Sequence, residues 1–408
     1  MIHFYSTNIV FTGAGFYADV VVRNNVIADA YDSSGAHSQG MFAGNLVGAQ
    51  LTDNIFDHNG WLELPAGHPL QKKAGATMFN HNTYIAESVQ LALVGNMFLR
   101  ASSMGNKFRS DHPHGEKNIE VRDNLYVEGE IGVGIGGNIP EFKNGTAHFD
   151  NVSVVDNVFV EIGRAQPTNR TLAWPIDVND WRGGQVSRNL VLNVTKPSVT
   201  NAFGVHVHGA FHDAEFADNV IYNLHTKDAY LLWETTMSFR YLNFPLVLDL
   251  YDICISRSRY LCVDTDIASN ITFVNNAFQA PFYASVLGQD GIKSGLSQWS
   301  GYSFAKTSYY SIAPPAKWFM SSAAEKGEPL TAWDAMTHGT GSVPTATKFL
   351  DPSRSLEEYA AAHGSPGTFE GFWAAARLHG APSASCGASD FTASAVNTWL
   401  RAGFVVGR

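Results

Sequence analysis

The most regular feature of the chain is a hydrophobic pattern that recurs along its first two thirds. Each copy has a short strand of alternating apolar residues, a polar residue followed by asparagine, and a second apolar strand. The copies read VVVRNNVIADA, AQLTDNIFDHN, LALVGNMFLRA, IEVRDNLYVEG, VSVVDNVFVEI, GQVSRNLVLNV, AEFADNVIYNL and ITFVNNAFQAP. Most lie about 30 residues apart, which is typical of a repeat architecture.

The asparagine of each copy predicts a bend and a stack. Asparagine tolerates the left-handed backbone conformation that a tight bend between two strands requires. Asparagine side chains stacked from one repeat to the next can also hydrogen-bond to one another. We therefore expect one column at a corner, containing Asn54, Asn124, Asn157, Asn189 and Asn219.

Repeats of this length, with two strands and an asparagine corner, resemble the right-handed parallel β-helix. The resemblance covers about residues 5–290 and implies an all-β fold of three-strand coils stacked about 4.8 Å apart. The L-x-x-L-x-L frame of leucine-rich repeats and the W-D signature of propeller blades do not occur in the repeats. We expect residues 1–290 to form this domain, with an inserted segment at about 239–265 that breaks the pattern.

The C-terminal part of the chain has a different pattern. Segment 291–350 is irregular and rich in aromatic residues, and we expect it to pack on the β-helix. From 351 to 408 the pattern is helical, since Ser355 and Glu358 have capping-box spacing and a second helix runs from Thr392 to Gly403. We expect these short helices to cap the last coil, because its strands would otherwise have an unpaired edge.

A third strand lies between successive asparagine corners, and its sequence varies most. Candidates include GNKFRSD (105–111), IGVGIGG (131–137), AWPIDVNDW (173–181), FGVHVHG (203–209) and YLLWET (230–235). If apolar residues point inward, Phe108, Ile135, Val178 and Val207 form one column. Four outward pairs then follow one another: Lys107 and Arg109, Gly134 and Gly136, Asp177 and Asn179, His206 and His208.

These outward pairs predict a functional site on one sheet face, with a notch of about sugar-ring size over the glycines. A functional site is expected on the strand whose sequence varies from repeat to repeat, while the other two strands keep the scaffold constant. The candidate catalytic residues are Lys107, Arg109, Asp177, His206, His208, His81 and Tyr84. The candidate substrate-binding residues are Gly134, Gly136, Asn179, Asn82, His112, Trp233 and Glu234.

Composition limits the partners. The 408 residues carry a formal net charge of −10 with no basic run, which argues against nucleic acid. No apolar stretch reaches the roughly 18 residues of a membrane span. Low charge content with many Gly and Asn residues is typical of an extracellular all-β protein, so we expect a secreted protein, although MIHFYSTNIVF has no signal-peptide pattern. Nothing in the sequence indicates an oligomeric state.

With this repeat, the chain resembles carbohydrate-active β-helix proteins: pectate- and alginate-lyase-like enzymes, glycoside hydrolases on the same scaffold, and phage or bacterial depolymerases. The resemblance rests on the repeat and the strand pairing, and no catalytic residue is carried over from it. It implies a polysaccharide substrate that lies in a groove along the flank of the β-helix.

The candidate side chains favour a lyase acting on a polysaccharide that contains uronic acids. Removing the C5 proton requires a base, for which Lys107, His206 or His208 are suitable. Arg109 can bind a carboxylate with two hydrogen bonds. Asp177 would orient a histidine of the next coil, or hold Ca²⁺ together with Asn179. No other cofactor is expected.

Two other functions fit the same face. A glycoside hydrolase needs two carboxylates, and Asp177 could be paired with Asp180, Asp111 or Glu234. A non-catalytic glycan-binding protein would line its groove with aromatic and amide side chains rather than with Lys, Arg and His.

Overall fold

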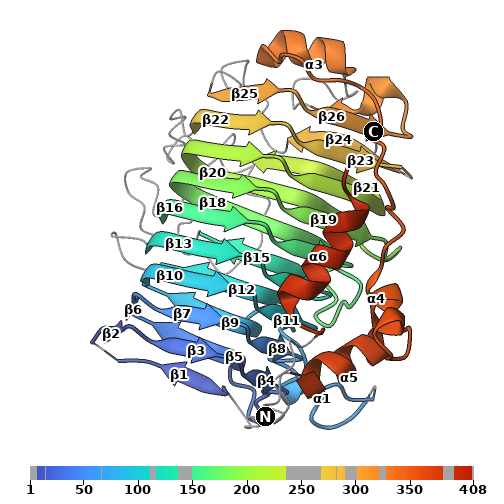
Figure 1. Ribbon diagram of the computed structural model, residues 1–408. Helices are drawn as coiled ribbons and strands as arrows, with labels where there is room; N and C mark the ends of the chain where they lie inside the picture. The colour runs from blue at the N-terminus through green and yellow to red at the C-terminus, as the bar shows by residue number, and fades with distance from the viewer. Residues whose placement is uncertain are drawn as a thin grey trace.

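The protein is mostly β, and its parallel strands form an elongated stack of repeats (Figure 1). The computed structural model describes residues 7–13, 15–65, 67–110, 116–136, 149–235, 268–281, 283–289, 301–320, 328–379 and 390–406. The predicted insertion at 239–265 and the candidate residues Asp111 and His112 lie outside these ranges.

Every named strand pairs in parallel with the equivalent strand of a neighbouring repeat, so the strands form three ladders. The first ladder contains β1 (Ile9–Phe11), β5 (Gln39–Gly44), β9 (His81–Ala86), β12 (Met104–Arg109), β15 (Ile131–Ile135), β24 (Tyr283–Gln289) and β27 (Phe319–Met320). Three long strands bend from one ladder into another: β18 (Leu172–Ser187), β20 (Asn201–Ala217) and β21 (Val220–Thr235).

The other two ladders complete each repeat. The second contains β2 (Tyr17–Ala18), β3 (Val21–Arg23), β6 (Leu46–Val47), β7 (Gln50–Thr52), β10 (Val89–Val94), β13 (Glu116–Arg122), β16 (Phe149–Val155), β22 (Ala268–Val274) and β25 (Tyr302–Ala305). The third contains β4 (Val26–Ala28), β8 (Ile55–Asp57), β11 (Met97–Leu99), β14 (Leu125–Val127), β17 (Val158–Val160), β19 (Leu190–Val194), β23 (Ala277–Ala280) and β26 (Ser308–Ser311).

The predicted asparagine column is confirmed at the corner between the second and third ladders. The Nδ2 group of Asn124 donates to Oδ1 of Asn157 at 3.0 Å, and Asn157 donates in the same way to Asn189 at 3.1 Å. The same bond links all eight asparagines in order: Asn25, Asn54, Asn96, Asn124, Asn157, Asn189, Asn219 and Asn276. The column joins the repeats along the stack.

The left-handed residue at each bend was predicted one position too late. The left-handed conformation belongs to the residue before each ladder asparagine, as at Asp123 (φ 53°) and Asp156 (φ 57°). The asparagine itself has an ordinary backbone, because its side chain must turn inward to reach the next repeat. The position before it is Asp or Asn in most repeats, and these residues tolerate the left-handed region; Gly95 and Arg188 are the other two occupants.

The interior of the stack is apolar and contains columns of aromatic rings. Phe98, Tyr126 and Phe159 stack with centroid separations of 5.1 and 4.6 Å. Strands β25 and β26 continue the pairing to Ser311, so the stack extends beyond residue 290, into the segment that the sequence pattern marks as irregular. Helix α3 (Leu330–Thr337) follows and places Trp333 against Phe319 at this end.

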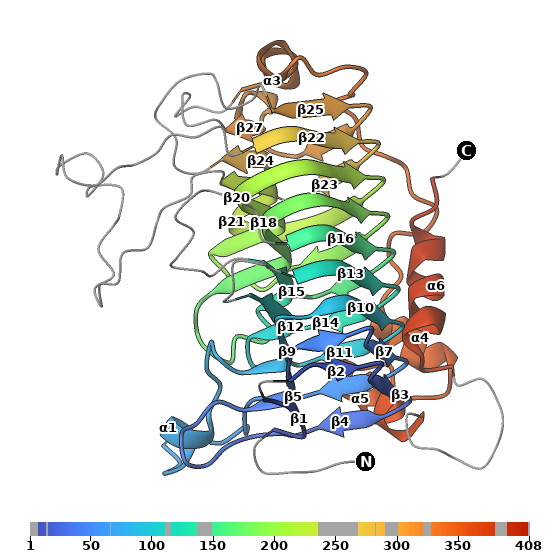
Figure 2. The same cartoon turned by 90° about the vertical axis from the view of Figure 1, so that its left-hand side faces the viewer.

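The C-terminal helices lie along the side of the stack and not over its last repeat. Helices α4 (Leu356–Ala362), α5 (Phe369–His379) and α6 (Ala393–Gly403) pack on the apolar outer face of the third ladder (Figure 2). The cap position of Ser355 is confirmed, since its side chain accepts from the Glu358 amide. The expectation that these helices cover the last coil is wrong, because the third ladder has an outward apolar strip that needs cover. Two short elements, α1 (Gln71–Ala74) and the 3₁₀ turn η2 (Pro315–Lys317), lie in connecting segments.

Candidate functional site

The candidate site lies on the outer face of the first ladder, in the predicted register. Phe108 pairs with Ile135, Ile135 with Val178 and Val178 with Val207, and all four side chains are buried. The predicted inward column is therefore confirmed. One position earlier, an outward column runs through successive repeats: Val10, Phe42, Tyr84, Lys107, Gly134, Asp177 and His206.

Within this column a notch lies over the two glycines. It has a volume of about 160 Å³ and is lined by Met104, Lys107, Phe108, Gly134, Gly136, Asp177 and Asn179. A cavity of about 150 Å³ holds one six-membered ring. A Cβ atom at Gly134 would lie 3.0 Å from the Met104 sulfur and 3.7 Å from Oδ2 of Asp177, so any side chain there would fill the notch.

Gly136 has a separate, conformational reason to be glycine. Its φ of +111° is a conformation that residues with a side chain rarely adopt, and a Cβ atom there would collide with the backbone of Asn179. The backbone conformation therefore requires glycine at position 136, whereas glycine at position 134 is needed only to keep the notch open.

On one side of the notch, Asp177 and His206 form a hydrogen-bonded pair. Oδ1 of Asp177 is 2.8 Å from Nδ1 of His206, and the two side chains are only 14% and 10% exposed. Trp174 and Phe203 hold the imidazole from its sides, each with a centroid separation of 5.0 Å. A carboxylate on Nδ1 fixes the orientation of the ring.

On the other side of the notch are the two cations and a tyrosine. Lys107 Nζ lies 5.6 Å from the centroid of the Tyr84 ring, and Nη1 of Arg109 donates to the Tyr84 hydroxyl at 3.4 Å. Lys107 and Asp177 are two strand steps apart along the stack, about 10 Å. Lys107 and Asp177 line the notch directly, whereas Arg109 lies two residues further along β12 and His206 one repeat further along the stack. We call Lys107 with Arg109 the cationic wall, and Asp177 with His206 the acid–imidazole wall.

Asn179 adds an acceptor to this notch. Its Oδ1 atom is buried and has no hydrogen-bond partner within the described ranges. With Asp177 it would give Ca²⁺ two oxygen ligands, whereas Ca²⁺ takes six to eight. No group of three or more His, Cys, Asp or Glu side chains in the described residues is arranged to hold a metal. The calcium site at Asp177 and Asn179 stays a prediction, and the proposed function assigns no step to a metal.

Two predicted site residues are buried and do not reach the surface of this face. Asn82 is buried, donates to the carbonyl of Leu99 at 3.0 Å and accepts from Asn59, so it is part of the scaffold. His81 is also fully buried, and neither ring nitrogen has a partner among the described residues. Burial and the nearby positive charge of Lys107 hold the pKa of His81 well below its usual range, so the ring is neutral. Neither residue can contact a substrate in this conformation.

Three further candidates can be placed by backbone register alone. His208 pairs with Asn179, and Trp233 pairs with His206 in the next repeat. Glu234 pairs with Val207, so it occupies the column whose earlier members are in the core. This register aligns Trp233, and not Glu234, with Lys107 and Asp177.

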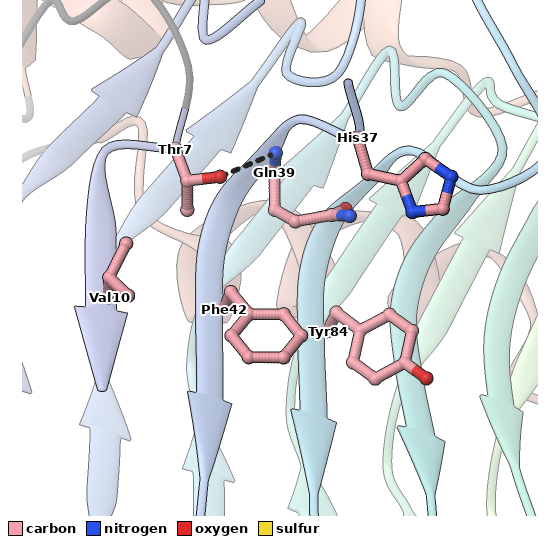
Figure 3. A pocket seen from close by; sticks show the side chains of 6 residues that line it. All are labelled: Thr7, Val10, His37, Gln39, Phe42 and Tyr84. Atoms are coloured by element: carbon pink, nitrogen blue, oxygen red, sulfur yellow. Dashed lines mark hydrogen bonds between the residues drawn. The ribbon is translucent and has the colours of Figure 1, made fainter. Parts of the chain in front are cut away.

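A second hollow on the same face was not expected from the sequence. It has a volume of about 270 Å³ and is lined by Thr7, Val10, His37, Gln39, Phe42 and Tyr84 (Figure 3). Met104, Trp174 and Phe203 are further residues of the face that the sequence analysis missed. Pairing GMF (40–42) with NTY (82–84) would have revealed the Phe42–Tyr84 column, but two adjacent inward residues, Asn82 and Thr83, obscure the alternation.

No family model, curated protein or solved structure matches this chain. None of the helices in the described part of the chain is long and apolar enough to span a membrane.

Proposed function

We propose that the protein is a secreted polysaccharide lyase that cleaves a uronic-acid-containing polysaccharide by β-elimination in the notch over Gly134. The observation that carries this proposal is that Lys107 and Asp177 line a hollow of sugar-ring size from opposite sides. Arg109 contacts the same tyrosine as Lys107, and His206 of the next repeat is hydrogen-bonded to Asp177. The cationic wall can bind the carboxylate of a uronic acid, and the acid–imidazole wall can accept the proton that is removed from its C5 atom.

We also propose that the stack is a right-handed parallel β-helix. Two observations support this assignment: the parallel strands form three ladders, and a continuous column of hydrogen-bonded asparagines joins the repeats. In such a scaffold an extended polymer can lie across the flank and contact several repeats at once, because equivalent positions recur about every 4.8 Å.

The proposed chemistry assigns one role to each wall. Arg109 and Lys107 bind the uronate carboxylate and stabilise the negative charge that develops on it. Nε2 of His206 takes the C5 proton, while Asp177 stabilises the imidazolium through Nδ1. The C5–H electron pair forms the C4–C5 double bond, the C4–O4 bond breaks, and O4 leaves with a proton from the imidazolium or water.

Hydrolysis and simple binding fit this notch less well. A hydrolase uses two carboxylates that flank the bond, whereas Asp177 is the one carboxylate among the described residues that line the notch, and it is bonded to His206. A passive glycan-binding surface has no need for this acid–imidazole pair opposite two cations.

The test is a screen of alginate, pectate, hyaluronan and bacterial exopolysaccharides for an unsaturated product that absorbs in the ultraviolet. We expect turnover by the natural chain, and a loss of at least about a hundredfold in His206→Ala, since general base catalysis contributes this much or more. Gly134→Leu should also abolish turnover by filling the notch.

The matched control is His212→Ala. His212 lies on the same strand, β20, but faces outward on the second ladder and bonds to Ser269. It should keep full activity. Release of reducing ends without ultraviolet absorbance would replace this proposal with hydrolysis centred on Asp177, and retention of a polymer without any product would indicate a binding protein.

A further inference from the structure

We propose that the second hollow, lined by Thr7, Val10, His37, Gln39, Phe42 and Tyr84, is a subsite that binds a sugar ring of the same polysaccharide by its uncharged C–H face. This inference rests on the proposed function for its polymer, but it concerns a different part of the face. It predicts that a second sugar unit of the polymer binds outside the notch, toward the N-terminal repeats.

The chemistry of the lining differs from that of the notch. No Lys, Arg, Asp or Glu side chain is among its six lining residues, whereas the notch has a lysine and an aspartate. Phe42 and Tyr84 lie next to one another, with centroids 5.3 Å apart (Figure 3). Aromatic faces beside a few polar groups are typical of sites that bind small organic rings.

The hollow is held in shape by bonds that do not involve a ligand. The Gln39 amide is committed at both ends, since Nε2 donates to the Phe79 carbonyl at 3.0 Å and Oε1 accepts from the His81 amide at 2.7 Å. The ring of His37 stacks on Phe79 at 5.0 Å. Binding to a pre-formed wall avoids the entropy cost of ordering side chains.

Tyr84 connects the two hollows. Its ring lines the second hollow beside Phe42, while Lys107 and Arg109 of the cationic wall contact the same side chain. Phe42 and Asp177 are four strand steps apart in one outward column, about 19 Å along the stack. A polymer that extends along the stack from the notch would reach Phe42 with its distant units.

The experiment measures retention in gels that contain alginate, pectate, hyaluronan or a bacterial exopolysaccharide, and turnover of disaccharides to octasaccharides of the retained polymer. Phe42→Ala should weaken retention and raise KM for the octasaccharide about tenfold, as expected for a lost aromatic contact. Phe42→Ala should leave KM for the shortest oligosaccharide that is cleaved unchanged. The defect should persist at high salt, because the lining has no charged pair to screen. Phe42→Tyr, which keeps the ring, should behave as the natural chain.

The outcomes separate this inference from the proposed function. If Phe42→Ala keeps a native thermal unfolding midpoint and binds long chains normally, the subsite is wrong even when the lyase assay succeeds. If no unsaturated product forms but Phe42→Ala still weakens retention, the subsite stands and the lyase proposal fails. If none of these polymers retains the natural chain, the subsite proposal is overturned.

Discussion

An asparagine of the ladder uses all of its side-chain hydrogen-bonding groups at once. Oδ1 of Asn157 accepts from the amide and from Nδ2 of Asn124, and its own Nδ2 donates to Asn189 and to the Val121 carbonyl. The side chain is fully buried. Removing one amide therefore leaves polar groups of its neighbours buried without partners, which costs more than the bonds themselves contribute.

Asn157→Ala should accordingly lower the free energy of unfolding by about 2–4 kcal/mol, since two buried donors lose their acceptor. Differential scanning calorimetry checks this as a lower unfolding temperature. Gln185→Ala is the control, because this exposed amide donates to Ser153 on the outer surface. It should change stability by less than about 0.5 kcal/mol. Equal effects of the two substitutions would contradict a special role for the ladder.

At the scale of elements, the first ladder could be predicted from sequence where its side chains alternate strictly. Phe108, Ile135, Val178 and Val207 define the inward face, so Lys107 and Asp177 follow as outward neighbours. The alternation fails in β9, where Asn82 and Thr83 are both buried. The burial of two adjacent side chains depends on contacts with the neighbouring repeats, which the sequence of one strand does not reveal. His81 and Asn82 were misplaced for this reason, and the second hollow was missed.

A pH effect is expected where β17 meets helix α4. Burial, opposed by a hydrogen bond from Thr195, raises the pKa of Glu161 from 4.5 to about 7. The folded protein therefore binds this proton more tightly than the unfolded chain, and stability should fall as the pH rises from about 4.5 to 7. Partial solvent exposure reduces the effect, to about 1–2 kcal/mol.

Unfolding temperatures of Glu161→Gln at pH 5 and pH 8 check this expectation. The amide cannot ionise, so the variant should lose less stability between the two pH values than the natural chain does. Glu215→Gln, which removes an exposed carboxyl on β20, should keep the natural pH dependence. An unchanged pH dependence in Glu161→Gln would show that Glu161 ionises normally.

At the scale of the whole molecule, helix α5 ties the C-terminal part of the chain to its first repeats. Arg377 donates to both carboxylate oxygens of Asp29 at 2.9 Å and also bonds to Asp57, which is fully buried and held by Arg100 as well. Helix positions such as 355–362 could be predicted from capping and periodicity. Their docking face could not, because it depends on an apolar strip assembled from many separate repeats.

Arg377→Ala should lower the free energy of unfolding by about 2–3 kcal/mol, because it removes a partner from a buried carboxylate. Limited proteolysis should then cut the 369–403 region first. Arg182→Ala breaks an exposed pair with Asp150 and should cost under about 1 kcal/mol. Unchanged protease resistance in Arg377→Ala would mean that apolar packing alone holds α5.

The same contact has a consequence for synthesis on the ribosome. Asp29 and Arg377 are separated by 348 residues. At about 5–20 residues per second, translation needs roughly 20–70 s to proceed from one to the other. Throughout that interval the outward side chains of Val26, Ile55 and Met97, which belong under the helices, have no cover of their own. The nascent chain thus carries a growing apolar strip that chaperones or neighbouring nascent chains can bind until the final helices emerge.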